Sequence, residues 1–584
     1  MPPKQEGYAP IPDVDIENGD IDLVGPNKDA DFVFSGNNEI SIMPRKICII
    51  GGGVAGLAAA RVLKSRSFQD ITIYEAAESL GGVWATGYPK FAIQTPGDLY
   101  EFPDKKLSHP KDYKDGLEIK KYCEDYAEEH GILKSIRMCN CVTSIESTFD
   151  GKWTVSTNSK AGSDKVIFDF VVLATGVYSP MHKHIPTIPG MGHFKGKVYH
   201  SEETAGITNR AGKRSLVVGF GKSAHDCAMN ALAETGVPPR LLFRSAHWCM
   251  PRKILGLVPM EWLLLSRFGQ GTLPSWQLCG PVEFVVHTVM KPLIWLYWRL
   301  VQGILISQLG LWGSSSHLRP TLRIEDDMYC SHGVVCHPKV FPMMHKKEIQ
   351  AVKGQIKRIL HSGDIELNDG TTIQADEIVF ATGFDRVHDF LPKELLDQKE
   401  DDGFYCYRQM LVPGCPNIAF LNSNVATVSN ITTAGIQSAW LAELLKGNIA
   451  LPSDIEEIIA TEKKWRRDKL HHAGNARAYL VQLHQLRYYD QLLSDMGANV
   501  KRKTSWILGP IGASLKNFFT PMYSSDYESI VTGEWRSDPV QIKAIGYKPS
   551  FLREWVVLVS VVAGCVLAAN NMETVYEIIR NKNE

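Results

Sequence analysis

The stretch that decides the fold is Arg45 to Leu63, which reads Arg-Lys-Ile-Cys-Ile-Ile-Gly-Gly-Gly-Val-Ala-Gly-Leu-Ala-Ala-Ala-Arg-Val-Leu. Its apolar run Ile47 to Ile50 is typical of a buried parallel strand, and an Ala/Leu-rich helical pattern closes the stretch. Between them stand Gly51, Gly53 and Gly56 in the spacing Gly-x-Gly-x-x-Gly. These glycines allow a tight turn, close approach of a pyrophosphate and close packing of helix on strand. The stretch therefore predicts a dinucleotide-binding turn.

A carboxylate stands where such a turn needs one. The next apolar run, Ile71 to Tyr74, ends in Glu75, which follows Gly51 by 24 positions. A carboxylate there would accept hydrogen bonds from a ribose. The strand, the turn, the helix and the acid together indicate a nucleotide whose adenosine has a free 2′-hydroxyl.

The same design recurs later in the chain. Ser215 to Val218 reads as a strand and is followed by Gly219-Phe220-Gly221-Lys222-Ser223-Ala224, in which alanine takes the third small position. The strand Arg240 to Phe243 ends in Arg244-Ser245, so Arg244 follows Gly219 by 25 positions. A guanidinium can grip a 2′-phosphate that a carboxylate would repel. This second unit predicts NADPH, although Arg244 could instead be an ordinary surface arginine.

Two apolar strands end in the same tripeptide, one in Ala174-Thr175-Gly176 and the other in Ala381-Thr382-Gly383. Small residues at a strand end let a bound cofactor approach the backbone. Hairpins around Asp150-Gly151 and Asp369-Gly370 precede them, so the order of turn, hairpin, strand and Ala-Thr-Gly occurs twice.

Composition excludes several classes of function. Lys plus Arg total 63 and Asp plus Glu total 64, so no overall field favours nucleic acid. The 12 cysteines contain no Cys-x-x-Cys, so neither a metal site nor a redox dithiol is indicated. The N-terminus lacks an apolar signal segment, which predicts synthesis in the cytosol.

Two segments are apolar without belonging to either nucleotide unit. Residues 248–315 predict a helical insertion, which could cover the active site, rest on a bilayer surface or pack as part of the core. Pro281 and Pro292 argue against one continuous membrane span in this segment. Near the C-terminus, residues 555–569 carry no charge. At 1.5 Å per residue they extend roughly 22 Å, short of a ~30 Å hydrocarbon core, so membrane association and burial in the core both stay open.

The predicted fold class is α/β, with two Rossmann-like dinucleotide-binding domains, a helical insertion and a helical C-terminal region. The expected limits are a mobile acidic tail (1–44), a first FAD-binding part (45–214), an NADPH-binding domain (215–375) containing the insertion, a second FAD-binding part with helices (376–500) and a C-terminal extension (501–584).

These residues together resemble the flavin-containing monooxygenases, the class B group that also includes Baeyer–Villiger enzymes. The resemblance covers about residues 45–500, and its most telling piece is Phe194-x-Gly196-x-x-x-His200 between the two glycine turns. The family fingerprint continues to an aromatic residue where this chain has Thr204. The subclass therefore stays open.

The resemblance implies FAD and NADPH as cofactors and assigns residues to them. Gly51, Gly53, Gly56 and Glu75 match the FAD turn, and Gly82, Val83 and Trp84 match the family's Gly-Gly-x-Trp beside the flavin. Gly219, Gly221, Ser223, Ala224 and Arg244 match the NADPH half, and Ala381-Thr382-Gly383-Phe384 matches the late linker strand. Gln94-Thr95-Pro96 stands where many members have Thr-Asn before the flavin ring, so Gln94 or Thr95 would replace that asparagine. His200 is the third candidate catalytic residue, expected to couple the positions of the two nucleotide domains, and a structural hydrogen-bonded histidine is the alternative.

The implied reaction is insertion of one oxygen atom of O2 into a lipophilic small molecule through a C4a-(hydro)peroxyflavin, as in secondary-metabolite biosynthesis. Heteroatom oxygenation, hydroxylation and Baeyer–Villiger oxidation of a ketone are the open alternatives. The last of these needs an arginine near the flavin, for which Arg319 and Arg323 are candidates. A disulfide reductase lacks its dithiol here, and a non-catalytic flavin-binding partner is the remaining alternative. The expected location is the cytosolic face of a membrane, such as the endoplasmic reticulum, or else the cytoplasm.

Overall fold

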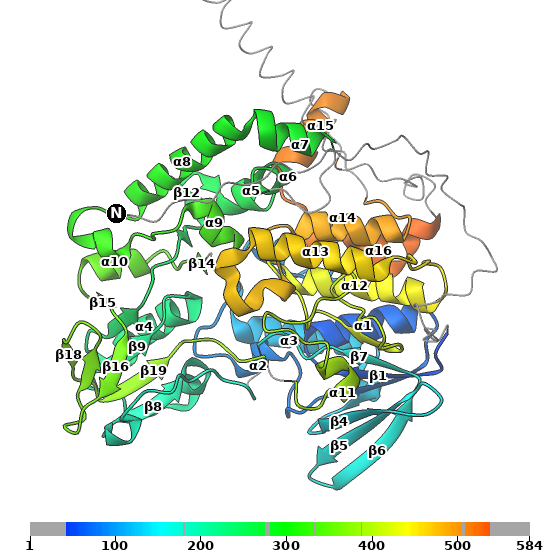
Figure 1. The fold of residues 1–584 in the computed structure, drawn as a ribbon, viewed down its shortest axis with the longest axis horizontal. Coiled ribbons are helices and arrows are strands. Elements are labelled where there is room, and N and C mark those ends of the chain that lie inside the picture. Colours follow the sequence, from blue (N-terminus) through cyan, green and yellow to red (C-terminus); the bar gives the residue numbers. More distant parts are fainter. Residues whose placement is uncertain are drawn as a thin grey trace, which may run out of the picture.

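Two parallel sheets organise the protein in a computed structural model that describes residues 43–178, 181–274, 281–330, 334–386, 388–500, 503 and 509–537 (Figure 1). The first sheet has the strand order β20-β7-β1-β2-β3. Its strands are β1 (Lys46–Ile50), β2 (Asp70–Tyr74), β3 (Ile136–Arg137), β7 (Phe170–Leu173) and β20 (Ile418–Phe420). The α/β fold class expected from the sequence is confirmed.

Both faces of the first sheet are buried, as expected for parallel strands. Ile47 and Ile49 of β1 pack beneath α1 (Val54–Ser65) and α12 (Asn430–Leu445). Cys48 and Ile50 face the antiparallel sheet β4-β5-β6 on the other side. Its strands are β4 (Cys141–Ser147), β5 (Trp153–Ser159) and β6 (Gly162–Phe168), which confirm the first expected hairpin.

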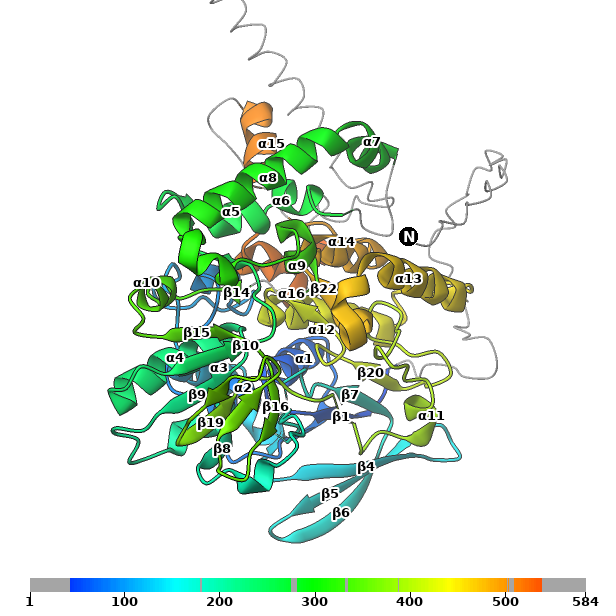
Figure 2. The ribbon, with the colours of Figure 1, turned by 60° about the vertical axis from the view of Figure 1, so that its left-hand side comes forward.

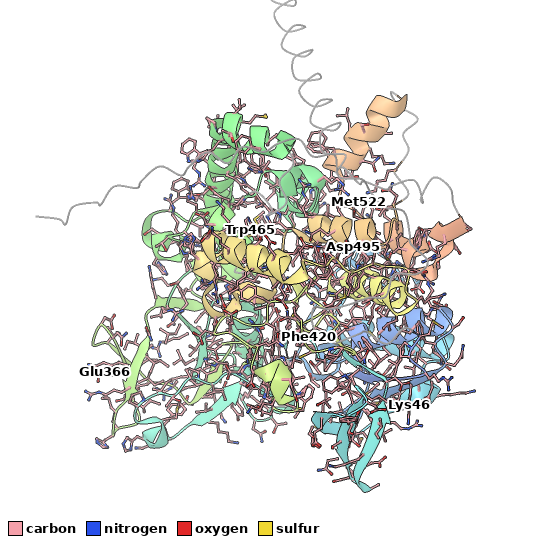
Figure 3. The ribbon with its side chains drawn as sticks, turned by 45° about the vertical axis from the view of Figure 1, so that its right-hand side comes forward. Lys46, Glu366, Phe420, Trp465, Asp495 and Met522 are labelled. Carbon is pink, nitrogen blue, oxygen red and sulfur yellow. The ribbon has the colours of Figure 1, made fainter. Side chains whose placement is uncertain are left out.

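The second sheet repeats this plan with the order β15-β10-β9-β19-β8. Its strands are β8 (Lys197–His200), β9 (Ser215–Val218), β10 (Arg240–Phe243), β15 (Gln350–Lys353) and β19 (Glu377–Phe380). One face packs on α4 (Lys222–Thr235) and the other on the antiparallel sheet β16-β17-β18. Those three strands are β16 (Ile356–Ile359), β17 (Ile365–Leu367) and β18 (Thr372–Ile373). In Figure 3, Lys46 and Glu366 mark the two halves on opposite sides of the molecule.

The sheets divide the chain differently from the expected limits at 214 and 375. β8 lies before residue 215 and β19 lies after residue 375, yet β19 pairs with both β8 and β9. Both strands therefore belong to the second sheet, although the sequence assigned them to the FAD-binding parts. The reason is that strand partnership depends on hydrogen bonds between distant segments, whereas the limits were drawn at local motifs.

The expected helical insertion is present and lies at one edge of the molecule (Figure 2). Its helices are α5 (Met260–Leu264), α6 (Arg267–Gly271), α7 (Pro281–Val289) and α8 (Lys291–Gln308). α7 ends before Met290 and α8 has Pro292 in its first turn, which confirms the break that the prolines predicted. The inner side of α8, with Trp298, Val301 and Leu305, packs on the core of the second half.

The C-terminal helices cover the first half and hold the insertion. They are α13 (Ile455–Lys469), α14 (Gln485–Asp495), α15 (Gly509–Phe519) and α16 (Glu528–Thr532). A buried bidentate ion pair joins Arg267 of α6 to Asp490 of α14, with nitrogen–oxygen distances of 2.7 and 2.8 Å. Phe268 packs on Phe518 and Phe519 of α15.

Among the helices of the described segments, none is long and apolar enough to cross a membrane. The acidic tail up to residue 42 and the apolar run 555–569 lie outside the described residues. The remaining α-helices of the described residues are α2 (Val83–Thr86), α3 (Gly116–Glu129), α9 (Ile324–Tyr329), α10 (Val340–His345) and α11 (Lys393–Leu396). The remaining strands are β11 (Cys249–Met250), β12 (Lys253–Ile254), β13 (Val258–Pro259), β14 (Val334–Val335), β21 (Ala426–Thr427) and β22 (Leu480–Gln482). The 3₁₀ helix η4 (Ser201–Gly206) follows β8.

Candidate functional site

The first glycine turn has a geometry that only glycine permits at two positions. Gly51 has a φ of 113°, and a Cβ there would lie 2.5 Å from the carbonyl oxygen of Ala174. A Cβ on Gly56 would lie 1.9 Å from the Gly51 oxygen. Gly53 is the N-cap residue that precedes α1, and no side chain caps that helix. The amide groups of its first turn are therefore available to a pyrophosphate.

Glu75 is held against this turn by its own carboxylate. Its Oε2 accepts a hydrogen bond from the Gly52 amide at 2.6 Å, and its Oε1 accepts one from the Ala77 amide at 2.8 Å. Each carboxylate oxygen can accept a further hydrogen bond. The carboxylate is thus fixed in the position expected for a ribose acceptor.

Gly82, Val83 and Trp84 lie beside the first glycine turn. Gly82 has a φ of 57° and is the N-cap residue that precedes α2, and a Cβ on it would lie 3.3 Å from the Gly53 Cα. The Trp84 indole is buried, stacks on Phe91 at 4.7 Å and donates a hydrogen bond to Tyr100. The motif therefore adjoins the proposed pyrophosphate position and has a rigid aromatic support.

The two candidates from Gln94-Thr95-Pro96 lie in different environments. Gln94 is exposed, and its Oε1 accepts a hydrogen bond from the Val335 amide of β14 at 3.1 Å. Thr95 is 2% exposed, and its hydroxyl has no hydrogen-bond partner within the described part of the chain. A buried hydroxyl without a partner costs about 1–3 kcal/mol, which a bound partner would relieve. Thr95 therefore fits a cofactor contact better than Gln94 does.

The second glycine turn copies the first. Gly219 has a φ of 136°, and a Cβ there would lie 2.5 Å from the carbonyl oxygen of Ala381. Gly221 is the N-cap residue that precedes α4, a helix that also lacks a side-chain cap. A Cβ on Gly221 would meet no atom within 4 Å. Ala224 is fully buried beneath the turn. Lys222 and Ser223 occupy the first turn of the helix, where Lys222 forms an ion pair with Asp226.

Each Ala-Thr-Gly run lies directly beside one of the two glycine turns. The amide of Ala174 donates to Ile50 and that of Ala381 donates to Val218, so each run extends the sheet beside its turn. Their carbonyl oxygens are the atoms that would clash with a side chain on Gly51 or Gly219. The glycines of the runs, Gly176 and Gly383, have φ values of 68° and 84°. Thr175 lies between Ala174 and Gly176, and Thr382 occupies the same place in the second run.

Arg244 and Ser245 are exposed at the end of β10. Within the described residues Arg244 has no ion-pair partner, and its position at the carboxyl end of a parallel strand is the one expected for a 2′-phosphate contact. The two arginines considered for Baeyer–Villiger chemistry fit less well. Arg323 is exposed and paired with Asp326 at 2.7 Å, and Arg319 is also exposed.

His200 is fully buried at the end of β8. Its Nε2 donates to the carbonyl oxygen of Gly383 at 2.9 Å, and its Nδ1 accepts from the Glu202 amide at 3.4 Å. Burial lowers the pKa of the imidazole. Because backbone groups use both nitrogens, this geometry suits a residue that holds η4 against the second Ala-Thr-Gly run.

The structure adds residues that the sequence did not single out. Tyr88 and Asp226 form a buried hydrogen bond between the two halves. Burial raises the pKa of Glu202, and an interaction with the Thr86 hydroxyl opposes that shift. These pairings join segments more than a hundred residues apart, so no local pattern indicates them.

Comparison with known proteins agrees with this geometry. A family profile described as flavin-binding monooxygenase-like matches residues 44–545. Human flavin-containing monooxygenase 3 is 26% identical over 89% of this chain and 98% of its own length. A probable flavin-containing monooxygenase 1 of Arabidopsis thaliana is 28% identical over 84% of this chain and 97% of its own length.

Solved structures show the same fold at lower identity. A polycyclic ketone monooxygenase from Thermothelomyces thermophila has a TM-score of 0.60 at 16% identity, covering 77% of this chain and 87% of that one. A steroid monooxygenase bound to NADP has a TM-score of 0.59 at 19% identity, covering 77% and 97%. The chain therefore belongs to the flavin-binding monooxygenase-like family and is a flavin-dependent monooxygenase with FAD and NADPH as its cofactors.

Proposed function

We propose that FAD binds at the first glycine turn and NADPH at the second, and that one oxygen atom of O2 is inserted into a lipophilic small molecule. The observation that carries this proposal is the repeated construction on two separate sheets, Gly51 against Ala174 and Gly219 against Ala381. Each turn leaves an uncapped helix start for a pyrophosphate. Glu75 at one turn and Arg244 at the other distinguish a free ribose from a phosphorylated one.

The flavin supplies the redox chemistry and O2 activation, whereas the protein supplies position and a dry site. Trp84 and Gly82 support the flavin beside the first turn. Thr95, whose hydroxyl has no hydrogen-bond partner in the described part of the chain, would offer that hydroxyl to the ring system. Gln94 orders the loop through its hydrogen bond with Val335 of β14. His200 keeps η4 in place beside the nucleotide.

For the reaction class we propose oxygenation of a nitrogen or sulfur atom in a lipophilic compound, such as an intermediate of secondary metabolism. Arg323 is paired and exposed, and Arg319 is exposed, which favours this class over Baeyer–Villiger oxidation of a ketone. Baeyer–Villiger oxidation is the alternative reaction, and the product analysis described next distinguishes the two.

The test combines cofactor content, O2 uptake and product mass. Purified protein is expected to be yellow, to consume O2 when NADPH is added, and to add 16 mass units to an amine or sulfide from a lipophilic panel. A gain of 16 units on ketones alone, with an ester as product, would establish the alternative. Flavin-free protein without NADPH oxidation would contradict the proposal.

We also propose that the insertion rests on a membrane and places the enzyme at the cytosolic face of a membrane such as the endoplasmic reticulum. The outer side of α8 exposes Leu293, Leu296 and Leu300, whose side chains are 60%, 48% and 60% accessible. Trp262 and Trp295 are exposed nearby in the insertion. Leucines with flanking tryptophans are typical of helices that lie in the membrane interface. The run 555–569 would strengthen this attachment.

A further inference from the structure

Tyr88 belongs by sequence to the first half but is buried in the core of the second. Its side chain is 7% exposed and packs in the cluster that contains Phe220 and Ala224. Its hydroxyl donates a hydrogen bond of 3.0 Å to Oδ2 of Asp226 on α4. Burial raises the pKa of Tyr88 well above its usual value, so the hydroxyl stays a proton donor.

The same carboxylate oxygen of Asp226 also binds the ammonium group of Lys222. Lys222 follows Gly221 in the first turn of α4, where the phosphates of NADPH are proposed to bind. Asp226 therefore joins a cation on the nucleotide side to a tyrosine on the flavin side. A bound phosphate attracts the same ammonium group and competes with Asp226 for it.

We propose that Lys222, Asp226 and Tyr88 form a relay that couples NADP(H) binding on α4 to the loop 82–97. This inference rests on the proposed assignment of NADPH to the second turn. When Lys222 turns toward the phosphates, the Asp226 carboxylate keeps one side-chain donor among the described residues, the Tyr88 hydroxyl. A buried carboxylate without a donor is costly, so Tyr88 lowers the free energy of releasing Lys222.

The relay gives Tyr88 a positioning role for the flavin. Its loop starts at the Gly82-Val83-Trp84 motif, and Gln94 near its end holds Val335 of β14. When NADPH is bound and Lys222 has turned away, the Tyr88 hydroxyl is the side-chain donor that Asp226 keeps among the described residues. This hydrogen bond then fixes the loop 82–97 against α4. A second tie joins the same loop and helix, because Asn230 donates to the Pro89 carbonyl oxygen at 2.6 Å.

Asn230 provides the matched control, since it ties the loop to α4 without touching Lys222. We would measure the Kd of NADP⁺ by calorimetry on flavin-loaded enzyme, with FAD content as the check on folding. Tyr88→Phe is expected to weaken NADP⁺ binding about tenfold at unchanged FAD content, because a hydrogen bond to a charged group is lost. Asn230→Ala should leave the Kd within about twofold. In a Lys222→Met background, Tyr88→Phe should have no further effect, because no ammonium remains to be released.

Several outcomes would overturn the relay. These are an unchanged Kd for Tyr88→Phe, an equal loss for Asn230→Ala, or the same loss for Tyr88→Phe in the Lys222→Met background. A failure of the cofactor assignment looks different. In that case Lys222→Met and Arg244→Ala would both bind NADP⁺ as tightly as the unmodified enzyme.

Discussion

At the scale of single residues, the two nucleotide sites depend on contacts that leave no room for a side chain. Gly51 and Gly219 each face the carbonyl oxygen of an alanine at the end of a neighbouring strand. Gly53 and Gly221 differ from them, because space remains around their α-carbons. A side chain at these two positions would leave the fold intact and occupy the place of a pyrophosphate.

Gly53→Glu is therefore expected to fold but to lose FAD. The nearest atom to a Cβ at this position is 3.6 Å away, an ordinary contact, while the added carboxylate would repel the pyrophosphate at the start of α1. The measurement is flavin absorbance per protein, with circular dichroism as a folding check. Gly221→Glu is the control and should stay yellow while losing reduction by NADPH. Stoichiometric FAD in Gly53→Glu would refute the assignment of the first turn.

Arg244→Ala tests the choice between NADPH and NADH. Loss of a charged hydrogen-bonded contact with a 2′-phosphate should cost roughly 2–3 kcal/mol, which raises the KM for NADPH about 30- to 150-fold. The KM for NADH should change little. Arg240→Ala is the control, because this arginine lies on the same strand but donates to the Gln374 carbonyl oxygen. Equal losses for both nucleotides would show that Arg244 does not contact the phosphate.

At the scale of elements, α8 stands out because it is apolar on both sides. Its inner side packs in the core of the second half, and its outer side exposes Leu293, Leu296 and Leu300. Such a helix is typical of a surface that another apolar phase covers. The break before Pro292 keeps α7 and α8 as two shorter helices.

Replacing Leu293, Leu296 and Leu300 together by Gln should reduce membrane binding. Burial of a leucine side chain contributes about 1.5–3 kcal/mol when complete, so three partly exposed leucines should change partitioning more than tenfold. The measurement is flotation of the full-length enzyme with phospholipid vesicles. Leu117→Gln is the control, since this residue on α3 is 75% exposed and lies outside the insertion. If the triple variant floats as the unmodified enzyme does, the outer side of α8 is not the contact.

At the scale of the whole molecule, the two halves are interleaved rather than arranged in series. β20 returns to the first sheet after the second sheet is complete, and β8 joins the second sheet before its glycine turn. Two buried histidines, His225 and His484, and two half-buried ones, His287 and His388, lie along this assembly. Burial lowers the pKa of His225 and His484 to about 3 and that of His287 and His388 to about 4.

These histidines predict a loss of stability in acid. The unfolded chain protonates them near pH 6.5, whereas the folded chain does not until about pH 3 or 4. The free energy of unfolding should therefore fall as the pH falls below 6.5, by about 1.4 kcal/mol per pH unit for each histidine. Glu101, whose pKa burial raises to about 7, opposes this slope. Urea unfolding at pH 7, 6 and 5 measures how the free energy of unfolding depends on pH.

His225→Leu isolates one contribution. Neither ring nitrogen of His225 has a hydrogen-bond partner within the described residues, so leucine leaves no lost partner behind. The slope below pH 6.5 should decrease by about 1.4 kcal/mol per pH unit. The exposed His361→Leu should leave it unchanged. An unaltered slope in His225→Leu would show that this histidine titrates in the folded protein.

The sequence by itself determined the structures that form within short segments, namely the two glycine turns and the hairpins. A glycine turn requires particular φ values and close approaches within one strand-turn-helix unit, so Gly51 to Gly56 and Gly219 to Ala224 are readable from spacing alone. The hairpins at Asp150 and Asp369 are local in the same sense. The cofactors followed because the residue that ends the second strand of each unit is also fixed by spacing.

Only the tertiary structure decided which strands share a sheet and which buried polar side chains have no hydrogen-bond partner within the described residues. β19 pairs with β8 across 180 positions, as between Glu377 and Lys197, because backbone hydrogen bonding selects its partner. Tyr88 is buried in the other half, and Thr95 is left without a hydrogen-bond partner within the described residues. The exposure of the outer side of α8 is likewise set by what packs around it. Each of these depends on contacts between segments far apart in the chain, and hydrophobic periodicity carries no information about such contacts.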